Sequence, residues 1–174
     1  MDLQTFTSFD GRIGRKTWWL GTLVMFVVGI ILYFILSSVM GTGFSAMMDP
    51  AKMMEPGFME SYMKSAAWQQ LISLVILGYP VTALMSKRLN DRNRPSWFKW
   101  AFWAPTVLST LLGVAGMGYA SMDAGGGVMM PTPTTLMYIL SILSMVVGLW
   151  ALIELGFLKG TAGPNPHGND PVAA

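Results

Sequence analysis

Four long apolar stretches dominate the pattern of hydrophobic and polar positions along the chain. They cover about residues 18–40, 66–86, 97–119 and 135–158. Each has roughly the 20 residues that an α-helix needs to cross the hydrocarbon core of a bilayer. The pattern therefore predicts an all-α polytopic membrane protein with four transmembrane helices.

The polar segments between these stretches predict the rest of the layout. We expect an N-terminal segment (1–16), a four-helix membrane domain (17–159) and a tail (160–174). The first apolar stretch is too long for a signal peptide, whose apolar region has about 7–15 residues, so we interpret it as a retained span. Asp49-Pro50 and Glu55-Pro56 predict helix starts between the first two spans. Pro80 and Pro105 predict kinks within the second and third spans, and residues 121–134, with their glycine run, predict a loop.

Composition narrows the possible functions. Of the 174 residues, 53% are hydrophobic and 11% are charged, whereas a soluble domain has about a quarter charged residues. One membrane domain is expected, without a second globular core. There is no cysteine and only one histidine, His167, so disulfides, thiolate sites and multi-histidine metal sites within one chain are excluded. We expect no metal and no cofactor.

Lysine and arginine are concentrated in alternate connections, which predicts the orientation of the spans. The positive-inside rule places the short loops that are rich in lysine and arginine in the cytoplasm. Four spans with both termini in the cytoplasm satisfy this rule at every loop. The expected cytoplasmic cations are Arg12, Arg15, Lys16, Lys87, Arg88, Arg92, Arg94, Lys99 and Lys159, whereas Lys52 and Lys64 fall on the other side.

Three motifs around these spans resemble those of a known family. Residues 9–19 resemble F-x-G-R-x-x-R-x-x-Y/F-W, residues 87–97 resemble R-R-L-H-D-x-x-x-S-x-W, and residues 160–171 resemble G-T-x-G-x-N-x-Y/F-G-x-D-P. In this order, the set is similar to the bacterial inner-membrane family catalogued as domain of unknown function 805. The resemblance covers nearly the whole chain and implies a multi-pass protein of the bacterial inner membrane, without an established activity. Asn90 stands at the family's usual histidine, and Pro166-His167 replaces a common arginine and aromatic.

The basic connection between the second and third spans has two interpretations. It is a topology signal with an ordinary aromatic belt, or it recognises anionic lipid headgroups, to which each lysine or arginine contributes about 1 kcal/mol. The candidate lipid or partner contacts are Arg12, Arg15, Lys16, Lys87, Arg88, Arg92, Arg94 and Trp97. Asp91 adds a structural prediction: a clasp in which it pairs with Arg88 or Arg94, or with Arg12 or Arg15 from the first motif.

Glu154 is the acid that falls within an apolar span. Acids inside a membrane are costly and suggest a functional role, such as proton or ion coupling. Lys159 follows about 7.5 Å further along the helix, so Glu154 lies near the cytoplasmic end. The alternative is a shallow structural ion pair with Lys159 or with the basic loop.

Methionines crowd the connection between the first two spans. Thioethers are soft ligands suited to Cu(I), or they form an adaptable apolar surface against lipid or a partner. These residues are Met47, Met48, Met53, Met54, Met59 and Met63. Gly113, Gly116 and Gly118 are expected to allow close helix packing.

No catalytic set of side chains can be assembled, so we do not expect an enzyme. The basic residues lie at the membrane interface, which argues against nucleic-acid binding. We expect an interaction or scaffold module that contacts anionic lipid, a membrane-protein partner or a second copy of itself. The alternative is a small transporter or channel subunit with Glu154 near the pathway.

Overall fold

The computed structural model describes residues 2–123 and 129–172. Short helices precede and follow the first long one: α1 (Gln4–Thr7), α2 (Arg15–Met40), α3 (Phe44–Met47) and α4 (Pro50–Met53). The chain then forms α5 (Phe58–Asp91), α6 (Phe98–Val114), the strands β1 (Tyr119–Asp123) and β2 (Met129–Pro133), and α7 (Thr135–Ala151), which continues as the π-helix η1 (Leu152–Phe157).

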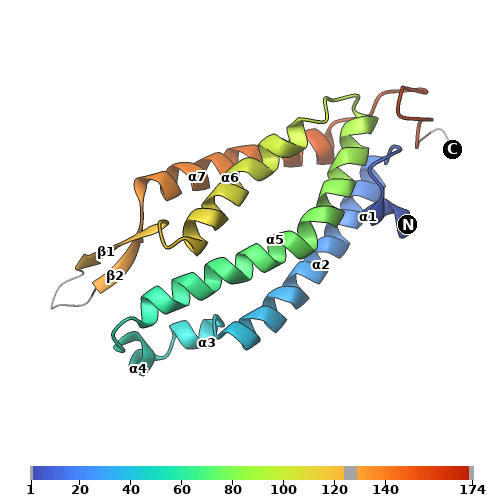
Figure 1. The fold of residues 1–174 in the computed structure, drawn as a ribbon. Helices are drawn as coiled ribbons and strands as arrows, with labels where there is room; N and C mark the ends of the chain where they lie inside the picture. Colours follow the sequence, from blue (N-terminus) through green and yellow to red (C-terminus); the bar gives the residue numbers. More distant parts are fainter. Residues whose placement is uncertain (1, 124–128, 173–174) are drawn as a thin grey trace.

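The four long helices pack in chain order. α2 packs on α5, α5 on α6 and α6 on α7, and η1 returns to contact α2 and α5. Both chain termini lie at one end of the bundle, which we call the terminal end, and the β1–β2 hairpin lies at the other, the hairpin end (Figure 1). The final π-helix thus closes the bundle at the terminal end.

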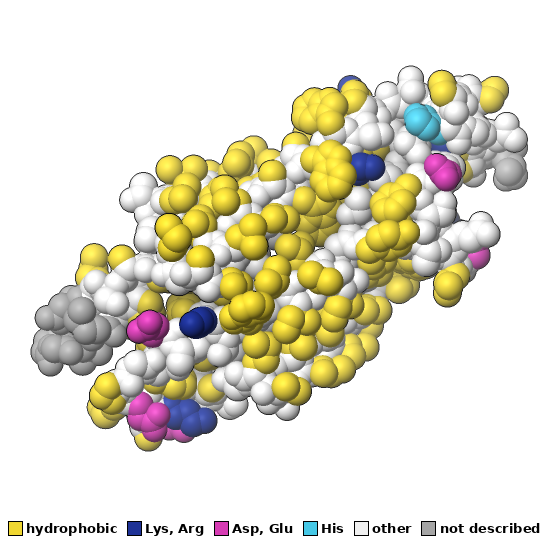
Figure 2. All heavy atoms as spheres, viewed as in Figure 1, with side chains coloured by type: hydrophobic (Ala, Val, Ile, Leu, Met, Phe, Trp, Pro, Cys, Tyr) yellow, Lys and Arg dark blue, Asp and Glu magenta, His cyan; other side chains and the backbone are white. Residues whose placement is uncertain are grey.

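Most of the surface along the long helices is apolar. Large side chains such as Phe26, Val75 and Ile142 are more than half exposed, and charged side chains gather toward the two ends of the molecule (Figure 2). Helices Arg15–Met40, Phe58–Asp91 and Thr135–Phe157 are long and apolar enough to cross a membrane. A surface of this kind is stable in lipid, so the chain is a multi-pass membrane protein.

Helix boundaries differ from those expected at both ends of the second span and at the end of the third. α5 begins at Phe58 rather than 66 and ends at Asp91 rather than 86. Its extension contains leucine, lysine and arginine, which are good helix formers, so Lys87 and Arg88 are helical rather than in a loop. α6 ends at Val114 rather than 119, because Gly116 adopts a left-handed conformation with φ of 72° and stops the helix.

The expected loop 121–134 contains an antiparallel hairpin. Tyr119 pairs with Pro133 and Asp123 with Met129. Proline is tolerated in β2 because each strand of a two-stranded sheet has a free edge. The glycine run at residues 125–127, expected to break any helix, lies outside the described residues.

The proline predictions concern two long helices and the connection before α5. Pro80 lies inside α5, and Figure 1 shows that α5 changes direction in its second half, as expected where proline removes a backbone donor. Pro105 lies inside α6. Asp49 caps α4 by accepting a hydrogen bond from the Ala51 amide at 3.1 Å, whereas the Glu55-Pro56 pair forms a turn before α5 begins.

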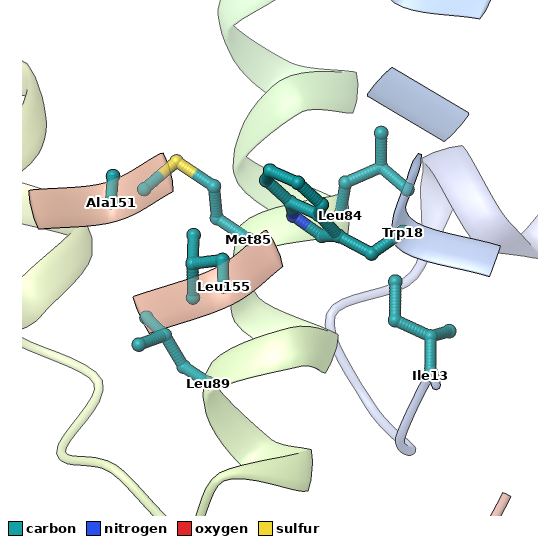
Figure 3. Packing of buried hydrophobic residues seen from close by; sticks show 7 residues of the cluster. All are labelled: Ile13, Trp18, Leu84, Met85, Leu89, Ala151 and Leu155. Atoms are coloured by element: carbon teal, nitrogen blue, oxygen red, sulfur yellow. The ribbon is translucent and has the colours of Figure 1, made fainter. Parts of the chain in front are cut away.

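The buried hydrophobic cluster lies at the terminal end. It consists of Ile13, Trp18, Leu84, Met85, Leu89, Ala151 and Leu155, shown in Figure 3. Close approach of the helices depends on glycine: a β-carbon on Gly21 would lie 2.6 Å from Leu84, and one on Gly156 would lie 2.9 Å from Trp19. Near the hairpin end, a β-carbon on Gly113 would lie 3.0 Å from Ala67 of α5, so this glycine serves packing within the bundle, whereas a β-carbon on Gly116 would meet no atom within 4 Å.

Candidate functional site

Asp91, the last residue of α5, lies between two arginines from different parts of the chain. Its Oδ1 accepts hydrogen bonds from Arg12 Nη2 at 2.9 Å and Nε at 3.1 Å, and its Oδ2 pairs with Arg88. The three side chains are at most 3% exposed. The arrangement ties the first motif to the second through a buried carboxylate, with Arg12 and Arg88 as the partners among the four arginines proposed.

Arg88 also satisfies the open end of the last helix. Its Nε donates to the Leu155 carbonyl at 2.7 Å and its Nη2 to the Leu158 carbonyl at 2.5 Å. The last carbonyls of a helix have no partners within it and carry a partial negative charge. The Trp19 indole donates to the Gly156 carbonyl at 3.1 Å. A guanidinium and an indole from other helices thus complete the C-terminal end of η1.

Arg12 likewise donates hydrogen bonds to backbone carbonyls, in this case those of the tail. Its guanidinium donates to the carbonyls of Thr161 at 2.6 Å, Gly163 at 2.8 Å and Gly168 at 3.1 Å. The described part of the tail has no helix or long strand, but hydrogen bonds hold it at a definite place. Its anchors are residues of the third motif, so that all three motifs meet at one site.

The glycines of this tail are required by geometry. A β-carbon at Gly160 would lie 2.1 Å from Asp91 Oδ2, which no side chain can do without displacing the carboxylate. Gly163 has φ of 74° and Gly168 has φ of 129°, conformations that favour glycine. Next to Gly160, the Thr161 amide donates to the Asp91 carbonyl at 2.9 Å.

Polar side chains hold the remaining turns. Asn90, at the histidine position of the motif, donates to the carbonyls of Phe9 at 3.2 Å and Gly11 at 3.1 Å. Asn165 donates to the Asn90 carbonyl at 3.0 Å. The Asp170 carboxylate accepts hydrogen bonds from the amides of Val172 and Gly163, and these bonds lower its pKa below the ordinary value.

Glu154 lies in η1 and is 5% exposed. Its Oε1 accepts hydrogen bonds from Arg92 Nη2 at 3.1 Å and Arg94 Nε at 2.6 Å. Glu154 therefore meets the basic loop, while Lys159 points to the exterior. We call Arg12, Arg88, Asp91, Arg92, Arg94 and Glu154 the ion-pair cluster.

The proposed lipid contacts divide into two groups. Arg12 and Arg88 are buried in the ion-pair cluster, and Lys87 is 6% exposed with its ammonium donating to the Gln4 carbonyl. The expectation that these three side chains contact headgroups is therefore corrected: the structure uses their donors inside the protein. Arg15 and Lys16 are exposed, and Trp97 is 59% exposed.

The remaining arginines of the basic loop, Arg92 and Arg94, have side-chain exposures between those of the two groups. The side chain of Arg92 is 17% exposed and that of Arg94 is 45% exposed, and both pair with Glu154. Two lysines outside the proposed lipid contacts also lie at the terminal end. Lys159 is exposed, and Lys99 Nζ lies 5.5 Å from the centre of the Phe9 ring and 5.8 Å from that of Trp100. For Lys99, the neighbouring Phe98 and Trp100 in the sequence were a signal of this position.

Methionines of the connection between α2 and α5 lie on the surface near the hairpin end. Met48 is 62% exposed and Met54 is 85% exposed. Within the described residues, no group of three or more histidines, cysteines, aspartates or glutamates is placed to hold a metal ion.

An apolar cavity of about 300 Å³ lies between the four long helices. Its lining includes Trp18, Thr22, Met25, Leu84, Gly148 and Ala151. Glu154 is outside this lining, although it follows Ala151 by less than one turn.

Apolar helices closed at one end by a buried ion-pair cluster define a multi-pass membrane protein whose three motifs build a single structural site. The chain belongs to the family described as "Protein of unknown function (DUF805)", whose model matches residues 6–169. The family resemblance of the three motifs is thereby confirmed over nearly the whole chain. Comparisons with curated proteins and with solved structures find no match.

Proposed function

We propose that the protein is a non-catalytic interaction module of the bacterial inner membrane that binds anionic lipid headgroups at its terminal end. Four cations of that end carry the proposal: Arg15, Lys16 and Lys159 are exposed, and Lys99 is partly buried. Arg15, Lys16, Lys99 and Lys159 form no ion pair with any acid whose side chain the structure describes. Each such cation near an anionic membrane surface contributes about 1 kcal/mol of binding.

The proposed topology has four spans and places both termini in the cytoplasm. α6 has 17 residues, about 25 Å of helix, which a bilayer core of about 30 Å accommodates by local thinning. Both termini lie at the same end (Figure 1), and this arrangement requires an even number of crossings. The concentration of lysine and arginine at that end supports a cytoplasmic location.

Exposed tryptophans lie near Lys99 in the chain, and the centre of the Trp100 ring lies 5.8 Å from its ammonium. Trp97 is 59% exposed and Trp100 is 64% exposed, in keeping with the preference of tryptophan for the headgroup region. These residues set a depth at which the exposed cations meet phosphates rather than acyl chains or bulk water.

The ion-pair cluster supports this surface in two ways. It contains four guanidinium groups and two carboxylates, so its own charge is positive and adds to the attraction for anions. It also links the N-terminal segment, the end of α5, η1 and the tail. These links hold the neighbouring cations at fixed positions.

Transport coupled through Glu154 has less support. The carboxylate is engaged by Arg92 and Arg94 and lies outside the lining of the cavity. A pathway residue is expected to face a hydrated space, whereas this cavity is lined by apolar side chains.

Native mass spectrometry of the protein released gently from its membrane tests the proposal. The variant carries Arg15→Gln, Lys16→Gln, Lys99→Gln and Lys159→Gln, and the matched control carries Lys52→Gln and Lys64→Gln near the hairpin end. We expect wild type and control to retain phosphatidylglycerol or cardiolipin and the variant to lose it. Equal retention by the variant, or retention of zwitterionic lipid alone by the wild type, would refute headgroup recognition. A co-purifying protein that replaces lipid would instead identify a protein partner.

A further inference from the structure

The cavity between the four long helices lies close to the exposed cations. On α2 its lining runs from Trp18 to Met25, a rise of about 10 Å along the helix. On the last helix it runs from Gly148 through Ala151 into η1. Figure 3 shows Trp18 of α2 pointing toward Leu84 and Met85 of α5. The cavity therefore belongs to the half of the membrane next to the terminal end.

The lining selects an apolar ligand. Methionine, leucine, valine, phenylalanine, alanine and glycine form most of it, with the Thr22 hydroxyl as a polar exception. A volume of about 300 Å³ lies at the lower end of the range for small-molecule sites. The side chains that line an unfilled space of this size forfeit dispersion contacts, and water has few polar partners there. The cavity thus suits a flexible hydrocarbon chain.

The charge beside the cavity indicates the kind of molecule to which such a hydrocarbon chain would belong. Arg15, Trp18, Thr22 and Met25 follow one another at spacings of three, four and three residues, so they lie on one face of α2. Arg15 is exposed, and its Nη1 donates to the Phe157 carbonyl at 3.2 Å, which leaves its other donors available. A chain that occupies the cavity places its polar end beside this guanidinium.

We infer that the cavity holds one acyl chain of an anionic phospholipid whose phosphate is bound by Arg15. This inference rests on the proposed function and makes it more specific. The protein recognises a single lipid by chain and headgroup together, rather than a diffuse anionic surface. Helices α2, α5 and α7 with η1 are apolar enough to span the membrane, so such a lipid reaches the site from the surrounding bilayer without passing through water.

A variant that fills the cavity tests the inference. A β-carbon added to Gly148 meets no atom within 4 Å, so Gly148→Leu extends into the open space without a backbone clash. The matched control is Val146→Leu on the same helix, where the side chain is 54% exposed and faces away from the cavity. Thr22→Leu narrows the cavity from α2 and serves as a second variant if Gly148→Leu does not fold.

The assay uses the full chain in liposomes that contain phosphatidylglycerol with a photoreactive group on one acyl chain. We expect cross-links to peptides of α2 and α7 in wild type and in Val146→Leu, and a several-fold loss of these cross-links in Gly148→Leu. Cross-linking of Gly148→Leu at the wild-type level, or labelling spread evenly over all exposed helices, would overturn the inference.

A phosphatidylcholine probe with the same photoreactive chain distinguishes the inference from the proposed function. If the cavity labels equally well with both probes, chain binding stands and headgroup recognition fails. If the cavity variant labels normally while the variant without Arg15, Lys16, Lys99 and Lys159 loses bound anionic lipid, headgroup recognition stands and the acyl-chain site is wrong.

Discussion

Replacement of Asp91 by asparagine tests whether the ion-pair cluster holds the terminal end together. Asp91→Asn keeps the size of the side chain and removes its charge. Arg12 and Arg88 would then be left without a counter-charge, although their side chains are at most 1% exposed. Breaking a buried ion pair from one side costs about 3–5 kcal/mol, because it leaves a charge buried and uncompensated.

The structure places the expected cost near the lower end of that range. Arg88 keeps its hydrogen bonds to the carbonyls of Leu155 and Leu158, and Arg12 keeps its bonds to the tail. These carbonyl dipoles offset part of the lost attraction. We therefore expect Asp91→Asn to lower the free energy of unfolding by about 3 kcal/mol.

Equilibrium unfolding in mixed micelles of a mild detergent and dodecyl sulfate measures this change. Asp10→Asn is the control, because Asp10 lies in the same motif and is exposed. The double variant Arg12→Gln with Asp91→Asn should cost less than the sum of the single changes, since the two side chains are in contact. A loss below about 1 kcal/mol in Asp91→Asn, or strict additivity, would refute the reasoning.

Three further predictions concern the tail and the second acid. Gly160→Ala should destabilise the protein by about 1–3 kcal/mol, because a β-carbon there would lie 2.1 Å from Asp91 Oδ2. It should also make the tail more sensitive to proteolysis. A tail as resistant to protease as that of the wild type would contradict this. Glu154→Gln should cost about 1–2 kcal/mol in the same unfolding assay, less than Asp91→Asn, because Arg94 is 45% exposed and solvent screens part of its interaction; a larger loss would argue against that ranking. The folded-state pKa of Asp170 lies below its ordinary value of 3.8, so its contribution to tail docking is present above that pH and is lost as the pH falls through the lower folded-state value. Protease sensitivity of the tail should therefore rise in acid, and Asp170→Asn should weaken that dependence.

Much of the architecture follows from the order of residues. Runs of about 20 apolar residues specify membrane helices, whatever their neighbours, because backbone groups in lipid must bond within the helix. Three such helices are borne out, and the three motifs identify the family. The boundaries of α5 and α6 were harder to predict from the apolar pattern. Helix propensity can extend a helix beyond its apolar part, and a left-handed glycine can shorten it.

The partners of the charged residues depended on the tertiary structure. From the sequence, Asp91 could pair with any of four arginines, and Glu154 with Lys159 or the basic loop. Arg12 lies 79 positions from Asp91, and their contact depends on how the segment before α2 lies against the end of α5. Sequence spacing constrains neighbours within one helix, but it does not specify the relative rotation of two helices.

The sequence by itself determined the apolar spans, the concentration of positive charge beside them and the motifs that recur in the family. Only the tertiary structure decided that Arg12, Lys87 and Arg88 lie inside while Arg15 and Lys16 remain exposed, and that an apolar cavity opens between the helices. The physical reason is that hydrophobicity and charge are properties of single residues. Burial and cavity volume depend on packing between residues far apart in the chain, including the close approach of Gly160 to Asp91.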